Sequence, residues 1–287
     1  KLSEFSKQEF LVSAYGVGDP SEISVSSKEI IRLLQKAFRK YAEETGIRPA
    51  GIIPGEIGAE VMAFQAAVFS GLPVVDADLV GGRAAPEIQM DVFSVYNLPI
   101  TPILGMSFSG KSFFIREKMG AREVELRMRA FFKKNGKGGI LIGYPITAGQ
   151  FRKIALTGSL SLSVGLGKKL IAKNIPGALE RIGGKILAKE KVLSVAAKGS
   201  GDFFQGWAKI GDLDLWIKNE NIQLSRLGKT IAQAPGIIAL LDFSGKPIHN
   251  SVLKKQLNKE VIVVGVLARG YWKTKRGRGL WRSAFPN

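Results

Sequence analysis

The spacing of apolar residues changes partway along the chain, and this change limits the folds open to it. In the first part apolar residues recur at helical intervals, as at Ile30, Leu33, Leu34 and Ala37. From about Gly183 short β-like runs are separated by glycine turns, and one of them, DLDLWI, alternates as a half-exposed strand does. The sequence therefore predicts an α/β part followed by a β-rich part.

Strands and helices alternate in the first part. Strands are predicted at 10–15, 50–53, 73–76 and 139–143, and helices between Ser26 and Gly46 and at 56–70, 121–134 and 159–173. Single helices between successive strands are typical of parallel pairing with right-handed crossovers. The expected fold class is thus α/β, with a mostly parallel sheet flanked by helices and a second, smaller β-rich domain.

The same patterns predict the domain boundaries. We expect an α/β domain over residues 1–177 and a β-rich domain over 178–267, with the basic tail 268–287 packing back on the first domain. Since no low-complexity linker separates the two domains, they are expected to share an interface.

The charge of the chain is concentrated in its second half. Residues 1–150 hold 18 Lys or Arg and 16 Asp or Glu, a balance of +2, whereas residues 151–287 hold 24 and 8, a balance of +16. A basic half can bind nucleic acid, an anionic surface or an acidic partner subunit, or it can simply be a Lys-rich surface. The tail cations interleave with Trp272 and Trp281, which suits phosphates and bases, although no nucleic-acid module is recognisable.

Composition excludes several kinds of chemistry. The chain has no cysteine and one histidine, His249, which removes thiolate nucleophiles, disulfides and multi-histidine metal sites. No cofactor is required by the sequence, and an oxygen-ligated magnesium or manganese ion is the metal that its residues suit. The longest apolar stretch, at 261–268, is too short to span a bilayer, and no export signal opens the chain, so we predict a cytoplasmic protein.

Charged side chains follow three of the predicted strands. In an open parallel sheet, the ligand crevice lies beyond the carboxyl ends of the strands. The turns at 16–20, 54–58 and 76–83 should meet there, and their charged residues, with the next one along, are Asp19, Glu56, Asp76, Asp78, Arg83 and Glu87. The alternative is structural: glutamates at helix starts complement the dipole, and aspartates form turns that an arginine neutralises.

A polar triplet stands out in the β-rich part. Asn219, Glu220 and Asn221 directly follow an apolar strand in a region with few acids. They either form a turn or reach into the cleft from the second domain.

Several segments together carry a family resemblance. GLPVVDADLVGGRAAPEIQM (71–90) resembles the signature of the S-methyl thiohydantoin desulfurase domain family, which is found next to hydantoinase-type enzymes. PGEIGAE, TGSLSLSVGLG, NEN and PGIIALLDFSGKPI resemble other motifs of this family in the same order. The chain departs from the family pattern in lacking an early glycine-rich turn, in an extra residue within DADLVGGRA, and in Glu60 at a position where an amide is common.

The resemblance implies a hydrolase acting on a five-membered cyclic amide or thiohydantoin-type small molecule. Such chemistry needs a base for water, donors for developing negative charge and a clamp for a substrate carboxylate. On this view Asp76, Asp78 and Glu87 are the expected catalytic residues. Arg83, Glu56, Asp19, Asn219 and Glu220 are the expected substrate-binding residues.

The competing prediction is a non-catalytic subunit or scaffold. Its basic C-terminal half would then bind an acidic protein partner or, less favoured, nucleic acid. Under either hypothesis we expect a homo- or hetero-oligomer with an acidic partner.

Overall fold

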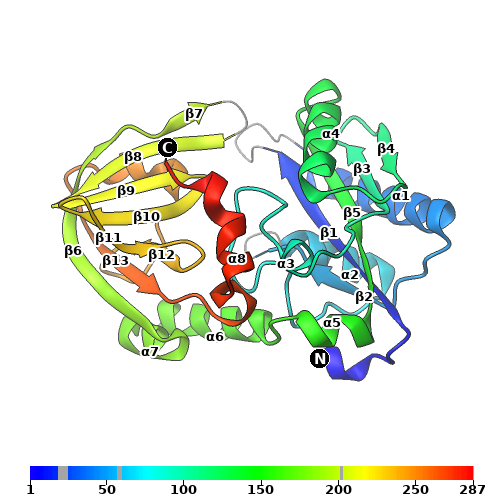
Figure 1. Cartoon of the computed structure of the whole chain (residues 1–287), viewed down its shortest axis with the longest axis horizontal. Helices are drawn as coiled ribbons and strands as arrows, with labels where there is room; N and C mark the ends of the chain where they lie inside the picture. Colours follow the sequence, from blue (N-terminus) through cyan, green and yellow to red (C-terminus); the bar gives the residue numbers. More distant parts are fainter. Residues whose placement is uncertain (19–24, 57–59, 201–202, 287) are drawn as a thin grey trace. The chain divides into compact units, whose positions relative to one another are not determined.

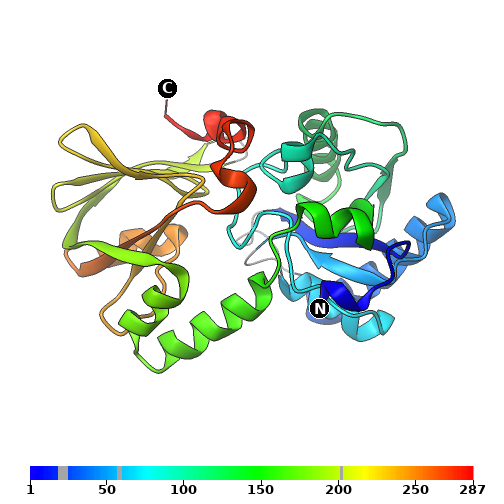
Figure 2. The same cartoon turned by 60° about the horizontal axis from the view of Figure 1, so that its bottom comes forward.

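The computed structural model of the chain describes residues 1–18, 25–56, 60–200 and 203–286. These residues form two compact units, Lys1–Leu160 and Ser161–Asn287 (Figures 1 and 2). Each unit has its own sheet and its own buried apolar cluster. The two units are described separately below, and the predicted boundary near residue 177 stays a prediction.

The first unit is built on a five-stranded mixed sheet in the order β2-β1-β5-β3-β4. Its strands are β1 (Phe10–Gly18), β2 (Gly51–Pro54), β3 (Ile103–Ser107), β4 (Ser112–Ile115) and β5 (Gly138–Thr147). Only β1 and β2 pair in parallel, while β5 runs antiparallel to both β1 and β3. The expectation of a mostly parallel sheet is therefore wrong, because β5 inserts between β1 and β3 in the opposite direction.

The strand predicted at 73–76 shrinks to one residue. Val74 makes a single parallel bridge to Ile52, and the chain then leaves the sheet as a loop. Three backbone bonds hold this segment beside β2: Ile52 N donates to Pro73 O, Val75 N to Ile52 O and Leu79 N to Pro54 O. These hydrogen bonds fix the loop at the C-terminal end of β2, where we expected it from the sequence.

Helices cover both faces of this sheet (Figure 1). The helices of the unit are η1 (Leu2–Glu4), α1 (Ser27–Thr45), α2 (Glu60–Ser70), α3 (Val92–Tyr96), α4 (Ala121–Lys134) and α5 (Ala148–Ile154). Apolar stripes of α1 and α2 pack on inward side chains such as Val12, Leu104 and Ile140. On the opposite face, a Cβ at Gly105 or Gly139 would meet Met128 or Phe132 of α4, so glycine lets this helix approach closely.

Local sequence signals set the ends of α1. Ser26 caps the helix and forms a capping box with Glu29, since each side chain accepts the other residue's backbone N–H. Gly46 ends the helix in the left-handed conformation, with φ of 71°. Both residues were the predicted boundaries.

The second unit is built on a curled antiparallel sheet with the order β11-β10-β9-β8-β6-β13-β12, and β7 pairs with β8 (Figure 1). Its strands are β6 (Gly184–Val195), β7 (Lys198–Ser200), β8 (Phe203–Ile210), β9 (Leu213–Lys218), β10 (Glu220–Arg226), β11 (Lys229–Gln233), β12 (Ile237–Leu241) and β13 (Glu260–Val266). The β-rich character predicted for this part of the chain is present.

One face of this sheet buries an apolar cluster that includes Ala208, Ile210, Leu215 and Ile217. The helices in or adjoining this unit are α6 (Ser159–Ile171), α7 (Ile175–Ile182), η2 (Asn250–Gln256), η3 (Gly270–Lys273), α8 (Lys275–Leu280) and η4 (Trp281–Ala284). None of the helices in the described part of the chain is long and apolar enough to cross a membrane.

The C-terminal tail belongs to the second unit. Trp216 Nε1 donates to Ala284 O over 2.8 Å, and Lys218 Nζ donates to Ser283 O over 2.9 Å, so β9 holds the end of the chain. The sequence had placed this tail against the first domain, and these bonds to β9 were not expected.

Candidate functional site

Three segments that are far apart in the sequence meet in the first unit. Leu79 N donates to Pro54 O, and Ala85 N donates to Glu56 Oε2 over 2.9 Å. The segment that follows Val75 also pairs with residues 157–158: Ala77 bridges Thr157, and Gly158 N donates to Asp76 O over 2.7 Å. The PGE, DADLVGGRAAPE and TGS segments therefore form one loop cluster.

Asp78 is the anchor of this cluster. It is fully buried, and its Oδ1 accepts Val80 N while its Oδ2 accepts Gly82 N, each over 2.7 Å. Gly81 and Gly82 have φ of 75° and 81°, a conformation that L side chains rarely adopt and that turns these amides toward the carboxylate. Burial raises the pKa of Asp78, and hydrogen bonds from Ser159 and the loop amides lower it by less.

Asp76 occupies a different environment two residues earlier. It is half-buried and lines a pocket of about 380 Å³ together with Arg152, Thr157 and Gly158 and with 1–3 of the chain. Arg152 lies in α5 and donates through Nε and Nη2 to Leu2 O, and through Nη2 to Phe5 O. The residues that line the pocket thus include a half-buried aspartate, an arginine and a threonine.

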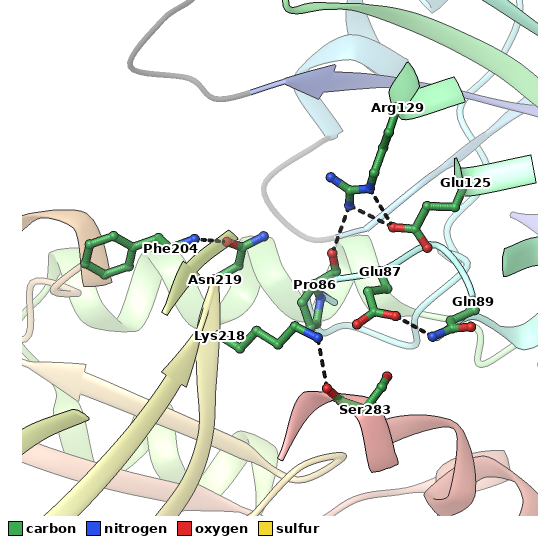
Figure 3. A network of polar contacts seen from close by, with 9 residues as sticks. All are labelled: Pro86, Glu87, Gln89, Glu125, Arg129, Phe204, Lys218, Asn219 and Ser283. Atoms are coloured by element: carbon green, nitrogen blue, oxygen red, sulfur yellow. Dashed lines mark hydrogen bonds and ion pairs between the residues drawn. The ribbon is translucent and has the colours of Figure 1, made fainter. Parts of the chain in front are cut away.

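Three more predicted residues, Glu56, Arg83 and Glu87, lie in the same loop cluster. Arg83 is 6% exposed, so it lies inside the cluster and not on its surface. Glu56 Oε2 accepts a hydrogen bond from the Ala85 amide. Glu87 accepts a hydrogen bond from Gln89 Nε2 (Figure 3). The structure therefore brings Glu56, Asp76, Asp78, Arg83 and Glu87 onto one loop system, but only Asp76 among them lines the pocket.

An ion pair on α4, between Arg129 and Glu125, contacts the loop at Pro86. Arg129 donates through Nε and Nη2 to the same Glu125 oxygen over 2.9 and 2.7 Å, and through Nη2 to Pro86 O over 3.4 Å (Figure 3). Burial raises the pKa of Glu125, with Arg129 lowering it and Glu87 raising it further. Sequence analysis missed this pair, although its i, i+4 spacing on a predicted helix is a recognisable signal.

A buried hydrogen-bonded pair, Asp91 and Tyr144, lies at the C-terminal end of the loop. Asp91 caps α3 through Ser94 N at 2.7 Å, and Tyr144 OH donates to Asp91 Oδ2 over 2.8 Å. Tyr144 lies in β5 with φ of 58°, a strained conformation for a tyrosine, and its ring packs edge-on against Phe93 at 5.0 Å. Burial raises the pKa of Asp91 to about 6. Nothing local in the sequence marks Tyr144 as a partner of Asp91.

Two further predicted site residues, Asn219 and Glu220, lie in the second unit. Asp19 falls outside the described residues. Asn219 forms the turn between β9 and β10 with φ of 54°, and its Oδ1 accepts Phe204 N over 2.9 Å (Figure 3). Glu220 begins β10 opposite Lys218. The structure thus shows the turn geometry that was one of the two alternatives for this triplet.

The residues that the structure describes include no group of three or more His, Cys, Asp or Glu side chains placed to hold a metal ion. The carboxylates of the loop cluster are instead bonded to backbone amides or neighbouring side chains, as described for Asp78, Glu56 and Glu87. No residue set can therefore be assigned to the oxygen-ligated metal that the composition allowed.

Fold and site together define a protein with an α/β unit that carries a carboxylate-rich loop cluster and a second unit formed by a curled antiparallel sheet. The chain belongs to the S-Me-THD-like family: residues 1–117 match the S-Me-THD-like N-terminal domain, and residues 120–282 match the S-Me-THD-like C-terminal domain. The family resemblance noted in the sequence is thereby confirmed.

A solved structure has the same fold. The chain is similar to the X-ray crystal structure of a protein from Chromobacterium violaceum, with a TM-score of 0.83 and 20% sequence identity over 99% of this chain and 83% of that chain. At this identity the likeness concerns the fold alone. No protein with a curated description matches the chain.

Proposed function

We propose that the chain is a hydrolase that removes the sulfur substituent from a five-membered S-alkyl thiohydantoin-type ring. The observation that carries this proposal is the meeting of the three family-like segments in one loop cluster, two of which line the pocket that Asp76 and Arg152 share. Membership of the S-Me-THD-like family supports the substrate class.

Asp76 is the proposed base. In the reaction, water loses a proton to the Asp76 carboxylate, and its oxygen bonds to the ring carbon that bears the sulfur. As this bond forms, the electron pair of the ring C=N bond moves to the ring nitrogen, which takes the proton from Asp76. The carbon–sulfur bond then breaks, the thiolate leaves and takes up the proton of the new hydroxyl, and the ring keeps the new oxygen as a carbonyl. A half-buried carboxylate beside a pocket suits this role better than Asp78, whose two oxygens are occupied by backbone amides.

Arg152 and Thr157 are the proposed donors to negative charge on the ring. Both line the pocket with Asp76, and a guanidinium and a hydroxyl are suitable donors to a developing anion. We assign positioning roles to Asp78, Arg83, Glu56 and Glu87, which shape the loop. In this proposal Arg152 takes the substrate-binding role that was predicted for Arg83, since Arg83 is almost completely buried.

The test is an assay of thiol release. The purified chain is incubated with an S-methyl thiohydantoin, and free thiol and hydantoin product are measured together. We expect both to appear in equal amounts, and we expect Asp76→Asn to lower the rate by roughly 100-fold or more, because general-base catalysis contributes about 10²–10⁴. A ring-opened product without thiol would instead indicate hydantoinase-type chemistry.

Controls separate chemistry from folding. Glu123→Gln removes a carboxylate of the same unit that is exposed and paired with Arg127 on α4, and it should leave the rate unchanged. Glu87→Gln should cause a smaller loss than Asp76→Asn, because Glu87 does not line the pocket. If Asp76→Asn retains full activity and the wild-type fold, the assignment of the base is wrong.

A further inference from the structure

A pair of tryptophans lies on the sheet face opposite the apolar cluster of the second unit. Trp207 of β8 and Trp216 of β9 are cross-strand partners with ring centroids 5.2 Å apart. Their strand neighbours Ala208 and Leu215 are buried in the cluster, so alternation places both indoles on the other face. Trp207 is 40% exposed, a large apolar surface left open to solvent.

A lysine follows each tryptophan by two residues, on the same face of its strand, and Lys218 is only 9% exposed. Lys209 of β8 bonds to Asp214, and Lys218 of β9 lies over the Phe203 ring at 4.5 Å. The bonds from Trp216 and Lys218 to Ala284 O and Ser283 O also hold the tail against β9 (Figure 1). Arg282, next to Ser283 in the chain, is exposed and lies in this tail segment. We call Trp207, Lys209, Trp216, Lys218 and Arg282 the Trp surface.

The backbone under Trp207 allows no side chain at the preceding position. Gly206 has φ of 144°, and a Cβ there would come within 2.6 Å of Ala197 Cα and 2.9 Å of Ala196 O. The segment 196–197 is in turn bonded to the strand, since Ala196 N donates to Trp207 O over 2.8 Å. The exposed indole therefore stands on a rigid, closely packed support, which limits the entropy lost when a ligand stacks on it.

We propose that the Trp surface binds single-stranded nucleic acid. Residues 161–287 hold 22 Lys or Arg and 8 Asp or Glu, a balance of +14, which attracts a polyanion. An acidic protein would satisfy the charge, but the centre of a protein interface is depleted in lysine, whereas here lysines flank the indoles. An exposed aromatic ring on a curled sheet in a strongly basic unit is an arrangement that can stack a base and neutralise phosphates.

The experiment is fluorescence anisotropy of a labelled 15-nucleotide single strand, titrated with the full chain from low to high salt. We expect log Kd to rise with log salt, with a slope set by the phosphate contacts, and Arg282→Ala to lower that slope by about 0.7. Trp207→Ala should weaken binding by roughly tenfold or more at every salt concentration, since it removes a stacking platform.

Phe243→Ala is the matched control. Phe243 is an exposed aromatic of the same unit, 54% accessible in the turn after β12, and its loss should leave binding unchanged. Equal weakening by Trp207→Ala and Phe243→Ala would overturn the proposal. So would equal affinity for a duplex of the same length, or tight binding of a poly-glutamate peptide that Trp207→Ala does not affect.

Discussion

Two aspartates, one in each unit, form similar turns in very different surroundings. Asp78 accepts Val80 N and Gly82 N, and Asp242 accepts Ser244 N and Lys246 N. Asp78 is buried, and burial raises its pKa, whereas hydrogen bonding by Ser244 lowers the pKa of the accessible Asp242. Desolvation therefore outweighs the hydrogen bonds in the first unit and not in the second.

The same contrast runs through both units. The first unit buries Asp78, Arg83, Asp91 and Glu125, and hydrogen bonds fix the three carboxylates, although its half of the chain is nearly neutral. The second unit carries the excess of positive charge but leaves most of it exposed, with ion pairs such as Lys209–Asp214 that are 40% accessible on both sides. In the functions proposed above, the buried charges of the first unit shape its site, whereas the exposed charges of the second unit belong to a binding surface.

The sharpest test of this contrast replaces the two aspartates in turn. Asp78→Ala leaves two amides of a buried loop without their acceptor, so we expect it to destabilise the protein by about 4 kcal/mol. Asp242→Ala exposes its amides to water and should have a much smaller effect. Urea unfolding followed by circular dichroism measures both, and equal losses would remove the distinction between the units.

A second test uses the titration of Asp91. Its folded pKa of about 6 lies above the ordinary value of 3.8, so between these values the folded protein holds a proton that the unfolded chain has released. Stability from this group is therefore greatest below about pH 4 and falls by about 3 kcal/mol as the pH rises through 6.

Asp91→Asn should remove this dependence, because an amide does not titrate. The unfolding free energies of wild type and variant should be measured from about pH 4 to pH 7. As the pH rises over this range, the stability of the variant should increase by about 3 kcal/mol relative to that of the wild type. Parallel curves would show that the carboxyl is not desolvated as the structure indicates.

Much of this architecture could be predicted from the sequence, but not the strand directions. The helix at 121–134 and the strands β8, β9 and β13 follow from local periodicity. The strands β3 and β4 were not predicted. The antiparallel course of β5 depends on a partner 120 residues or more away, as in the pairing of Gly18 with Gly138, and no local pattern encodes it.

The candidate site divides in the same way. Asp76, Asp78 and Glu87 could be proposed from the sequence because they lie in one contiguous segment that begins at the end of a predicted strand. Arg152 and Tyr144 were missed because each reaches the site from a distant element, a short helix and a strained position in β5. Only packing brings such residues together.

A third test compares ion pairs. Arg129→Ala leaves the carboxylate of Glu125, which is 8% exposed, without its partner, and we expect a loss of about 2 kcal/mol. The same truncation must also free the loop at Pro86, so the rate of thiol release should fall as well. A change in stability without a change in rate would separate the ion pair from the site.

The smallest effect is expected from Lys209→Ala. Its bond to Asp214 is exposed on both sides and screened by water, so stability should fall by about 0.5 kcal/mol or less. Oligonucleotide binding should weaken all the same, since a phosphate contact is lost. A large loss of stability would show that the second unit uses its charges structurally, as the first does.

The central claim is that the small-molecule site lies in the loop cluster of the first unit. Amide hydrogen exchange, with and without an S-methyl thiohydantoin bound to the Asp76→Asn variant, tests it most directly. With substrate bound, we expect slower amide exchange in peptides that cover 76–88 and 152–160, and no change in 203–218. Protection confined to 203–218 and the tail, or the absence of protection at every substrate concentration, would contradict it.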